Sequence, residues 1–343
     1  MENGYLNSAK KEIGNMLIDN HGRNINYLRL AVTDRCNLRC NYCMPSEGID
    51  FAKTDTLLSI AELKQVSEIL VSQGIDKIRI TGGEPFVRKD LMELMRHLSQ
   101  LEGLKDISVT TNATLIGPHI DELKELGITN INVSLDSINR ETFERITRRK
   151  QFDTVHENLI RLITEGFNVR INFIVLEGQN EQDIVPILDV MKYYDVSVRF
   201  LEEMPFNGGS KNFSDIKWNY KAILDHIAET YPHYTKLESP KTSTSINYKI
   251  DGHAGTFGII PSFSRTFCGT CNRLRITATG DVVTCLYGKP VTNLRKLVRE
   301  HNSEENIREA ILGAISKRFK TGFEAQEEHS ATVFDSSMTS IGG

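Results

Sequence analysis

The six cysteines of this chain form two groups of three, and this pattern points to iron–sulfur chemistry. The first cysteine group is Cys36, Cys40 and Cys43, and the second cysteine group is Cys268, Cys271 and Cys285. An iron–sulfur cluster normally takes four cysteine thiolates, so a four-iron cluster with three protein ligands keeps one iron open. An open position is typical of a catalytic metal, whereas a structural site closes with four protein ligands. The sequence therefore predicts two clusters, each with one iron available to a small molecule.

Zinc binding and disulfide formation are the alternatives for these cysteines. His21 could complete a zinc site at the first group and His253 at the second, although the C-x3-C-x2-C spacing differs from common zinc hooks. Disulfides would leave one cysteine of each group unpaired. We see no secretory signal and no apolar run long enough to cross a bilayer, so we expect a cytoplasmic protein with reduced thiols.

Arginine interrupts four segments that otherwise have the composition of buried strands. Each of Arg29, Arg79, Arg170 and Arg199 is flanked by Leu, Ile, Val or Phe. Buried parallel strands normally consist of Val, Ile and Leu, and a guanidinium among them has to be paired. A neighbouring glutamate could neutralise any single one. If the four side chains all alternate inward, they converge on one lumen and form an anion site.

Two further arginines extend this set. Arg273 and Arg275 are two residues apart, so they share one face if the segment is extended. The planar guanidinium suits phosphate oxygens, and a polyphosphate would satisfy the whole set. There is no G-x-x-x-x-G-K-[ST] loop, so a nucleotide is not expected to bind as in P-loop proteins. The net charge of −4 argues against nucleic-acid binding.

Strand-like and helix-like segments alternate along the first two thirds of the chain. We expect strands at 28–33, 77–81, 106–111, 130–135, 168–176 and 196–202, with helices between them at 59–72, 91–98, 120–126, 155–166 and 184–193. This alternation indicates an α/β fold with a parallel sheet. Six units are fewer than the eight of a closed barrel, so we predict an incomplete, open parallel β/α barrel. A doubly wound open sheet is the alternative.

The character of the sequence changes after Met204. A Gly- and Asn-rich loop is expected at 205–217, followed by a helix at 218–229 and strands at 246–250 and 256–260. Helical segments begin again at Asn293 and Ser303. With 343 residues, 39% hydrophobic and 25% charged, the chain is long enough for two domains. We predict a barrel domain at 1–235 and a smaller C-terminal α+β iron–sulfur domain at 236–343.

A glycine-rich turn stands at the end of the second expected strand. The strand at 77–81 runs directly into Gly82-Gly83-Glu84-Pro85. Two glycines at the carboxyl end of a strand let the backbone come close to a ligand. The first cysteine group follows the preceding strand, so both loops are expected at the carboxyl end of the barrel, where barrel enzymes build their sites.

These motifs resemble those of a known family. The C-x3-C-x2-C loop with Tyr42, together with the GGEP turn, resembles the signature of radical S-adenosylmethionine enzymes. The segments LRLAVTDRCNLRCNYCMP, IRITGGEP, INVSLDS, CNRLRI and the terminal IGG are similar to those of the GTP 3′,8-cyclase family of molybdenum-cofactor biosynthesis. The similarity extends over nearly the whole chain, and the spacing of both cysteine groups agrees with it.

The resemblance implies a site with two [4Fe–4S] clusters, S-adenosylmethionine and GTP. The first cysteine group would hold the cluster that binds S-adenosylmethionine, and the second group an auxiliary cluster that faces the guanine. The positions implied for S-adenosylmethionine are Tyr42, Gly83, Ser134 and Met204. The positions implied for GTP are Arg29, Arg79, Thr110, Arg170, Arg273 and Arg275, to which the strand pattern adds Arg199 and Lys77. The terminal Gly342-Gly343 would reach into the site.

The same resemblance implies the reaction and the partners. The product would be (8S)-3′,8-cyclo-7,8-dihydroguanosine 5′-triphosphate, formed by radical chemistry from GTP. A reductant or electron-donor protein, a downstream cyclic pyranopterin monophosphate synthase and a homodimer are implied as partners. Two rivals stay open: a radical S-adenosylmethionine enzyme that modifies peptides, and a non-catalytic zinc-binding module.

Two residues depart from the family pattern. Arg170 stands where lysine is more usual, which keeps the charge but changes the shape of the cation. Ala113 stands where glycine is commoner, and a positive backbone φ at this position would be strained.

Overall fold

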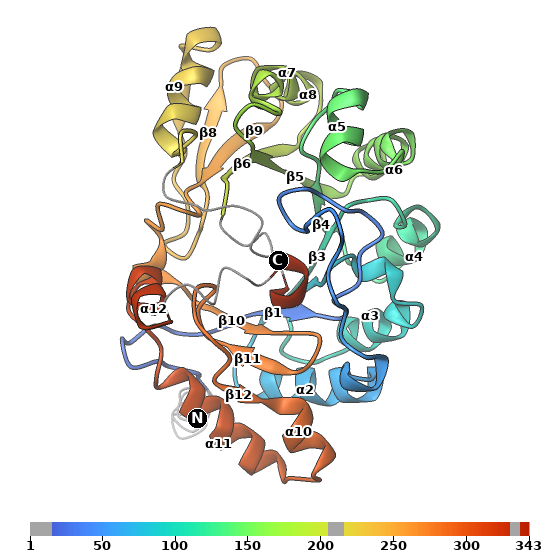
Figure 1. Ribbon diagram of the computed structural model, residues 1–343, viewed down its shortest axis with the longest axis vertical. Helices are drawn as coiled ribbons and strands as arrows, with labels where there is room; N and C mark the ends of the chain where they lie inside the picture. Colours follow the sequence, from blue (N-terminus) through green and yellow to red (C-terminus); the bar gives the residue numbers. More distant parts are fainter. Residues whose placement is uncertain (1–15, 205–215, 330–336, 343) are drawn as a thin grey trace, which may run out of the picture.

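The computed structural model describes residues 16–204, 216–329 and 337–342. All the strands among these residues belong to one twelve-stranded sheet, and this sheet curls into an open barrel. Six consecutive strands run parallel in sequence order and form the barrel wall (Figure 1). They are β1 (Tyr27–Ala31), β2 (Lys77–Thr81), β3 (Asp106–Thr111), β4 (Asn130–Ser134), β5 (Asn168–Val175) and β6 (Ser197–Glu202). The predicted open parallel barrel is therefore confirmed.

Helices cover the outer face of these six strands. They are α2 (Ile60–Ser72), α3 (Leu91–Ser99), α4 (Ile120–Glu125), α5 (Arg140–Thr147), α6 (Phe152–Thr164), α7 (Ile184–Leu188) and α8 (Val190–Tyr193). Short 3-10 helices lie in the loops: η1 (Thr54–Thr56), η2 (Pro85–Val87), η3 (Gly117–His119), η4 (Glu181–Asp183) and η5 (Cys268–Thr270). Helix α2 begins where its sequence allows, because Ser59 and Glu62 form a reciprocal capping box.

The expected helices are present with small shifts, and one helix is additional. The additional helix is α5, whose sequence RETFERIT is mostly polar. Only Phe143 and Ile146 form its apolar face, which is too short to show a helical period in the sequence. The segment at 184–193 is broken into α7 and α8. Gly74, Gly127 and Gly166 lie just past helix ends and have positive φ, at 97°, 71° and 82° respectively.

The C-terminal third of the chain adds strands to both edges of the barrel wall. On one edge, β9 (Thr256–Ile260) pairs parallel with β6, and β8 (Ile246–Ile250) and β7 (Tyr234–Lys236) follow. On the other edge, β10 (Arg273–Ile276) pairs parallel with β1, and β11 (Asp281–Val283) and β12 (Thr292–Asn293) follow. Strands from both sides of residue 235 thus belong to one continuous sheet.

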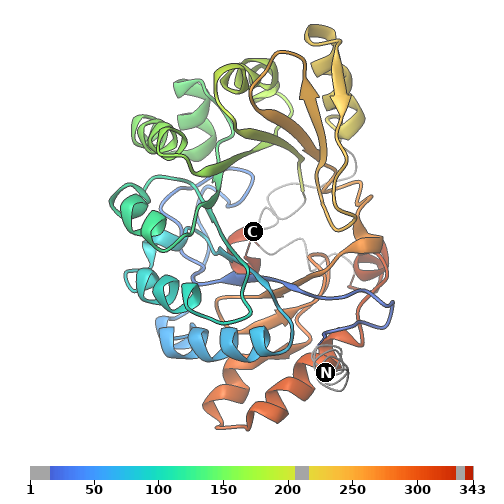
Figure 2. The same ribbon diagram turned by 180° about the vertical axis from the view of Figure 1, so that it is seen from behind.

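The C-terminal helices pack around this sheet. They are α9 (Tyr220–Thr230), α10 (Leu294–Arg299), α11 (Glu304–Ile315), α12 (Gly322–His329) and α13 (Met338–Ile341). Helix α10 lies beside α2 in both views (Figures 1 and 2), and Arg299 of α10 bonds to Glu62 at 2.6 Å. Helix α13 lies in the middle of the ring of strands in Figure 1.

The two faces of the barrel strands differ in polarity. On β1 and β2 the residues that face the helices, Leu28, Leu30, Ile78 and Ile80, are fully buried in the main apolar core. The alternate residues face the lumen, and many of them are charged or polar. Within the described part of the chain, no helix combines the length and the apolar composition that a membrane span requires.

Candidate active site

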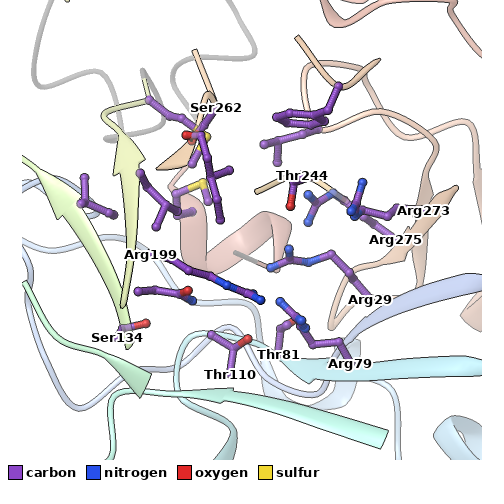
Figure 3. A pocket seen from close by; sticks show the side chains of 18 of the residues that line it. Arg29, Arg79, Thr81, Thr110, Ser134, Arg199, Thr244, Ser262, Arg273 and Arg275 are labelled. Carbon is purple, nitrogen blue, oxygen red and sulfur yellow. The ribbon is translucent and has the colours of Figure 1, made fainter. Parts of the chain in front are cut away.

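One cavity of about 620 Å³ occupies the lumen, and arginines from separate strands line it. Arg29 of β1 is the register partner of Arg79 on β2 and of Arg275 on β10. Figure 3 shows the side chains of Arg29, Arg79 and Arg199 pointing toward one another across the cavity. All six predicted arginines line it: Arg29, Arg79, Arg170, Arg199, Arg273 and Arg275.

Burial, together with repulsion from neighbouring arginines, destabilises the charge of several of these side chains. Burial, followed by repulsion from Arg275 and Arg79, holds the pKa of Arg29 well below its ordinary value. Burial and the neighbouring arginines lower the pKa of Arg199 to about 9, and burial lowers that of Arg275 to about 10. The buried Nε of Arg199 has no hydrogen-bond acceptor among the described residues. A bound polyanion would supply the missing negative charge.

The first cysteine group lies in the loop that follows β1. The Asn112 side-chain amide donates to the Cys36 sulfur at 3.7 Å and to Asn37 at 3.0 Å. Burial raises the pKa of Cys36 to about 12, so this thiol needs a bound metal to become a thiolate.

The glycine-rich turn packs directly against this cysteine loop. A Cβ at Gly83 would lie 2.3 Å from the carbonyl oxygen of Arg35, and one at Gly82 would lie 2.5 Å from that of Thr33. The Gly83 amide donates to the Thr33 carbonyl at 2.9 Å. Glycine is therefore required here because two backbone segments meet without room for side chains.

A buried carboxylate network supports the same end of the lumen. The Tyr42 hydroxyl donates to Asp136 at 2.8 Å, and the Ile174 amide donates to the other oxygen of Asp136 at 2.9 Å. Burial raises the pKa of Asp136 to about 6 despite these two bonds. Ser134, two residues before Asp136, lines the same cavity, and so does Met204.

The second cysteine group lies at the opposite end of the lumen from the first. Cys36 follows the carboxyl end of β1, whereas Cys271 precedes the amino end of β10, which runs parallel to β1. Cys285 follows β11, which is antiparallel to β10, so it returns to the same end. Two groups of thiols therefore bracket the arginine-lined space.

Cationic groups surround the sulfur of Cys271. Arg273 donates to this sulfur at 3.8 Å and Arg318 at 3.6 Å. Burial alone would raise the pKa of Cys271, but the two arginines bring it down to about 7. The Gly322 amide donates to the Cys268 sulfur at 3.4 Å.

The end of the chain enters the lumen. The Gly342 carbonyl accepts a hydrogen bond from Arg275 at 3.3 Å and one from the Thr81 hydroxyl at 3.5 Å. Ser337 donates to the carbonyl of Cys43 at 2.8 Å, which ties the helix α13 segment to the first cysteine loop. Gly343 lies outside the described residues.

Comparison with known proteins identifies the family. Residues 30–191 match the Radical SAM superfamily, and residues 196–323 match Molybdenum Cofactor Synthesis C. The chain is 38% identical over 332 residues to the mitochondrial GTP 3′,8-cyclase of Arabidopsis thaliana. The aligned residues are 96% of this chain and 84% of that protein. The chain belongs to the GTP 3′,8-cyclase family of radical S-adenosylmethionine enzymes.

Other relatives agree with this membership, and a solved structure shares the fold. GTP 3′,8-cyclase of Syntrophomonas wolfei is 37% identical over 303 residues, covering 88% of this chain and 93% of that one. Molybdenum cofactor biosynthesis protein 1 of Homo sapiens is 39% identical over 315 residues, which are 92% of this chain but only 49% of that protein, so this chain spans about half its length. Streptococcus suis SuiB bound to S-adenosylmethionine superposes with a TM-score of 0.59 over 97% of this chain and 76% of that one; at 15% identity this shows the fold alone.

The cysteines suit the clusters that members of this family use. All six thiols are free, all six line the lumen, and N–H donors point at the sulfurs of Cys36, Cys268 and Cys271, as is common around iron–sulfur clusters. Among the described residues, no three His, Cys, Asp or Glu side chains lie close enough to hold a single metal ion.

The histidines considered as zinc ligands lie elsewhere. The His21 ring contacts the Arg318 carbonyl at 2.9 Å, on the side of the second cysteine group rather than the first. His253 packs edge-on against Tyr231. Neither histidine lines the cavity that contains the cysteines, so neither lies where it was expected to complete a zinc site.

The cavity brings together all the cysteines and all the positions predicted for S-adenosylmethionine and GTP. Besides the arginines and cysteines, it is lined by Tyr42, Lys77, Gly83, Thr110, Ser134 and Met204. Sequence reasoning missed Asn112, Asp136, Arg265 and Arg318, which also line it. Asn112 and Asp136 each follow a predicted strand directly, and Asp136 lies within the INVSLDS segment, so both could have been found by position. Arg265 and Arg318 lie in segments without a motif.

Proposed function

We propose that this chain converts GTP to (8S)-3′,8-cyclo-7,8-dihydroguanosine 5′-triphosphate, an early step of molybdenum-cofactor biosynthesis. One observation carries the proposal: two cysteine groups lie at opposite ends of a single cavity whose wall is lined with arginine. A nucleoside triphosphate has the charge that this wall lacks. The family membership supplies the reaction class.

The arginines of the wall bind the triphosphate. Arg29, Arg79 and Arg275 stand side by side on three neighbouring strands, so their guanidiniums can share phosphate oxygens. Lys77 forms a short ion pair with Asp106, so a carboxylate already lies beside this cation. Arg170 and Arg199 extend the cationic wall on β5 and β6, and Thr110 adds a hydroxyl.

The cysteine groups hold the cofactors. Cys36, Cys40 and Cys43 hold the [4Fe–4S] cluster that binds S-adenosylmethionine, beside Tyr42, Gly83, Ser134 and Met204. Cys268, Cys271 and Cys285 hold the auxiliary [4Fe–4S] cluster at the guanine end. When bound, S-adenosylmethionine and the first cluster supply the radical chemistry that removes hydrogen from a sugar carbon.

The remaining residues of the site orient the substrate and exclude water. Tyr42 and Asp136 fix the cysteine loop against β5, and the backbone contact at Gly83 fixes it against β2. Helix α13 and the Gly342 carbonyl fill part of the lumen and hold Arg275 in place. Such enclosure protects a reactive radical from solvent.

The partners and the compartment follow from the same proposal. The reaction needs a reductant or an electron-donor protein, and its product passes to a cyclic pyranopterin monophosphate synthase. We also propose a homodimer located in the cytoplasm.

Anaerobic incubation with GTP, S-adenosylmethionine and a strong reductant tests the function. Mass spectrometry should detect the cyclised nucleotide, and cleavage of S-adenosylmethionine should depend on GTP. A protein that cleaves S-adenosylmethionine without any dependence on GTP would instead be a different radical enzyme, such as a peptide-modifying one. A colourless protein that contains zinc and no sulfide would be a non-catalytic zinc module.

A further inference from the structure

A buried ionic network joins the N-terminal turn to the second cysteine group. Residues 18–24 form a turn closed by an antiparallel bridge between Ile18 and Asn24. The Asp19 side chain is fully buried in this turn and accepts a hydrogen bond from the Arg23 Nε at 2.6 Å. It also lies 3.6 Å from the Nε of Arg318, whose side chain is 3% exposed. Burial would raise the pKa of Asp19, but the bonds from Arg23 and from the turn's backbone hold it below its ordinary value.

Both arginines of this network reach the backbone of the cysteine loop. Arg23 donates to the Cys268 carbonyl at 3.0 Å and to the Phe319 carbonyl at 2.8 Å. Arg318 donates to the Cys271 carbonyl at 3.3 Å and to the Cys271 sulfur at 3.6 Å. One carboxylate thus lies beside two guanidiniums, hydrogen-bonded to Arg23 and ion-paired with Arg318, and each guanidinium contacts a different cysteine of the group.

Arg318 keeps hydrogen-bonding capacity that the described residues do not use. Its Nη1 is buried and has no acceptor within the described part of the chain, although the side chain lines the cavity beside Cys271. A buried guanidinium nitrogen without an acceptor is costly. The inorganic sulfur of a cluster bound at the second cysteine group is an acceptor of the right charge.

We propose that Arg318 is a positioning residue that raises the reduction potential of the cluster held by Cys268, Cys271 and Cys285, and that the Asp19 carboxylate moderates this effect. The proposal rests on the auxiliary cluster of the proposed function. Reduction adds negative charge to a cluster, so a fixed cation against a ligand sulfur favours the reduced form. Asp19 moderates this effect because its carboxylate shares the cation.

The test isolates the second cluster. A background variant in which Cys36, Cys40 and Cys43 are replaced by alanine removes the first group, and the potential of the remaining cluster is followed by electron paramagnetic resonance during a redox titration. In this background, Arg318→Gln should shift the midpoint potential to more negative values, and Arg318→Lys should recover most of the shift. Arg88→Gln is the matched control, because Arg88 also binds two backbone carbonyls, of Val32 and Leu58, but does not line the cavity.

A second variant keeps the test decisive if Arg318→Gln fails to retain iron. Asp19→Asn removes the moderating carboxylate and should shift the potential to more positive values with iron and sulfide retained. An unchanged potential in Arg318→Gln with full iron content overturns the proposal. The proposal is also overturned if both Arg318→Gln and Arg318→Lys lose iron and the midpoint potential of Asp19→Asn is unchanged. GTP binding, measured on the same proteins, separates this result from the proposed function: absence of GTP binding with the predicted potential shifts would reject the cyclase and keep the role of Arg318.

Discussion

Arg29 and Arg275 lie opposite each other on the parallel strands β1 and β10, although one stands near the start of the chain and the other near its end. Both face the lumen, and both have a pKa that burial lowers. Folding therefore brings two cationic side chains together on neighbouring strands. Such an arrangement destabilises the folded protein unless an anionic ligand binds there. Loss of one arginine should therefore stabilise the ligand-free protein and weaken the binding of the ligand.

Arg199→Met tests this opposition most cleanly, because the Nε of Arg199 has no acceptor in the described residues. The free energy of unfolding of the ligand-free protein should rise by about 1 kcal/mol, since an apolar side chain replaces a buried cation. The dissociation constant for GTP should rise about tenfold to a hundredfold, the effect of losing a charge-assisted hydrogen bond. Chemical denaturation and equilibrium titration measure the two quantities. Arg199→Lys keeps the charge, so its free energy of unfolding and its dissociation constant for GTP should both lie between those of the wild type and Arg199→Met. Loss of both stability and affinity in Arg199→Met would contradict the argument.

Arg170→Lys restores the residue that is more usual in the family. Arg170 makes one hydrogen bond, to the Asn130 side chain at 3.1 Å, and it is only partly buried. Since the charge persists, we expect the dissociation constant for GTP to change by less than about fivefold. Arg170→Met should weaken binding clearly more than this. If lysine weakens binding as much as methionine does, the planar guanidinium itself is required.

The arginine wall could be predicted from the sequence because it depends on local alternation. Arg29 and Arg79 each stand between two apolar residues, and strand periodicity puts such a residue on the face opposite its neighbours. The cysteine groups could be predicted because ligand spacing is itself local. These local patterns therefore predicted both the lumen and its positive charge.

Long-range register could not be predicted in the same way. Nothing in the local sequence indicates that β10 pairs with β1, and this pairing decides that Arg275 joins Arg29. The contacts of Arg318 with Cys271 and with Asp19 likewise join three segments that are distant in the chain. Such contacts depend on the packing of the whole chain and leave no periodic signal.

Ala113 shows a strained position that the sequence did reveal. Its φ is 60°, the left-handed conformation that was expected to strain any residue other than glycine here. Ala113→Gly should change the free energy of unfolding by less than about 1 kcal/mol, because relief of left-handed strain and loss of a buried methyl group are each worth about that amount. Ala113→Val should lose more than about 2 kcal/mol, since a β-branched residue tolerates this φ poorly. Chemical denaturation of the wild type, Ala113→Gly and Ala113→Val measures these free energies of unfolding. If Ala113→Val is as stable as the wild type, the backbone at this position is free to move.

Gly83→Ala should remove the first cluster selectively. The new Cβ would lie 2.3 Å from the Arg35 carbonyl oxygen and 2.6 Å from its carbon, so the cysteine loop has to move. Iron and sulfide analysis after anaerobic reconstitution should show about half the wild-type content. Gly269→Ala is the matched control, because a Cβ at Gly269, between Cys268 and Cys271, meets no atom within 4 Å. Full iron content in Gly83→Ala, or an equal loss in Gly269→Ala, would disprove the steric argument.

Glu84 should make the stability of the ligand-free protein depend on pH. Burial raises its pKa from 4.5 to about 7, although it accepts bonds from the Asn112 and Phe86 amides and the Thr111 hydroxyl. The folded protein then binds more protons than the unfolded chain between these two values. Stability contributed by the protonated carboxyl is therefore present below about pH 4.5 and is lost as the pH rises toward about 7.

Glu84→Gln removes this titration without changing the size of the side chain. We expect the variant to be less stable at pH 5, because an amide cannot accept all three bonds and turns an N–H toward a backbone donor. Its free energy of unfolding should nevertheless fall less than that of the wild type between pH 5 and pH 7, by a difference of up to about 3 kcal/mol. Urea denaturation at half-unit pH intervals measures both curves. Parallel curves would mean that Glu84 stays ionised throughout this range, stabilised by its three donors rather than destabilised by burial.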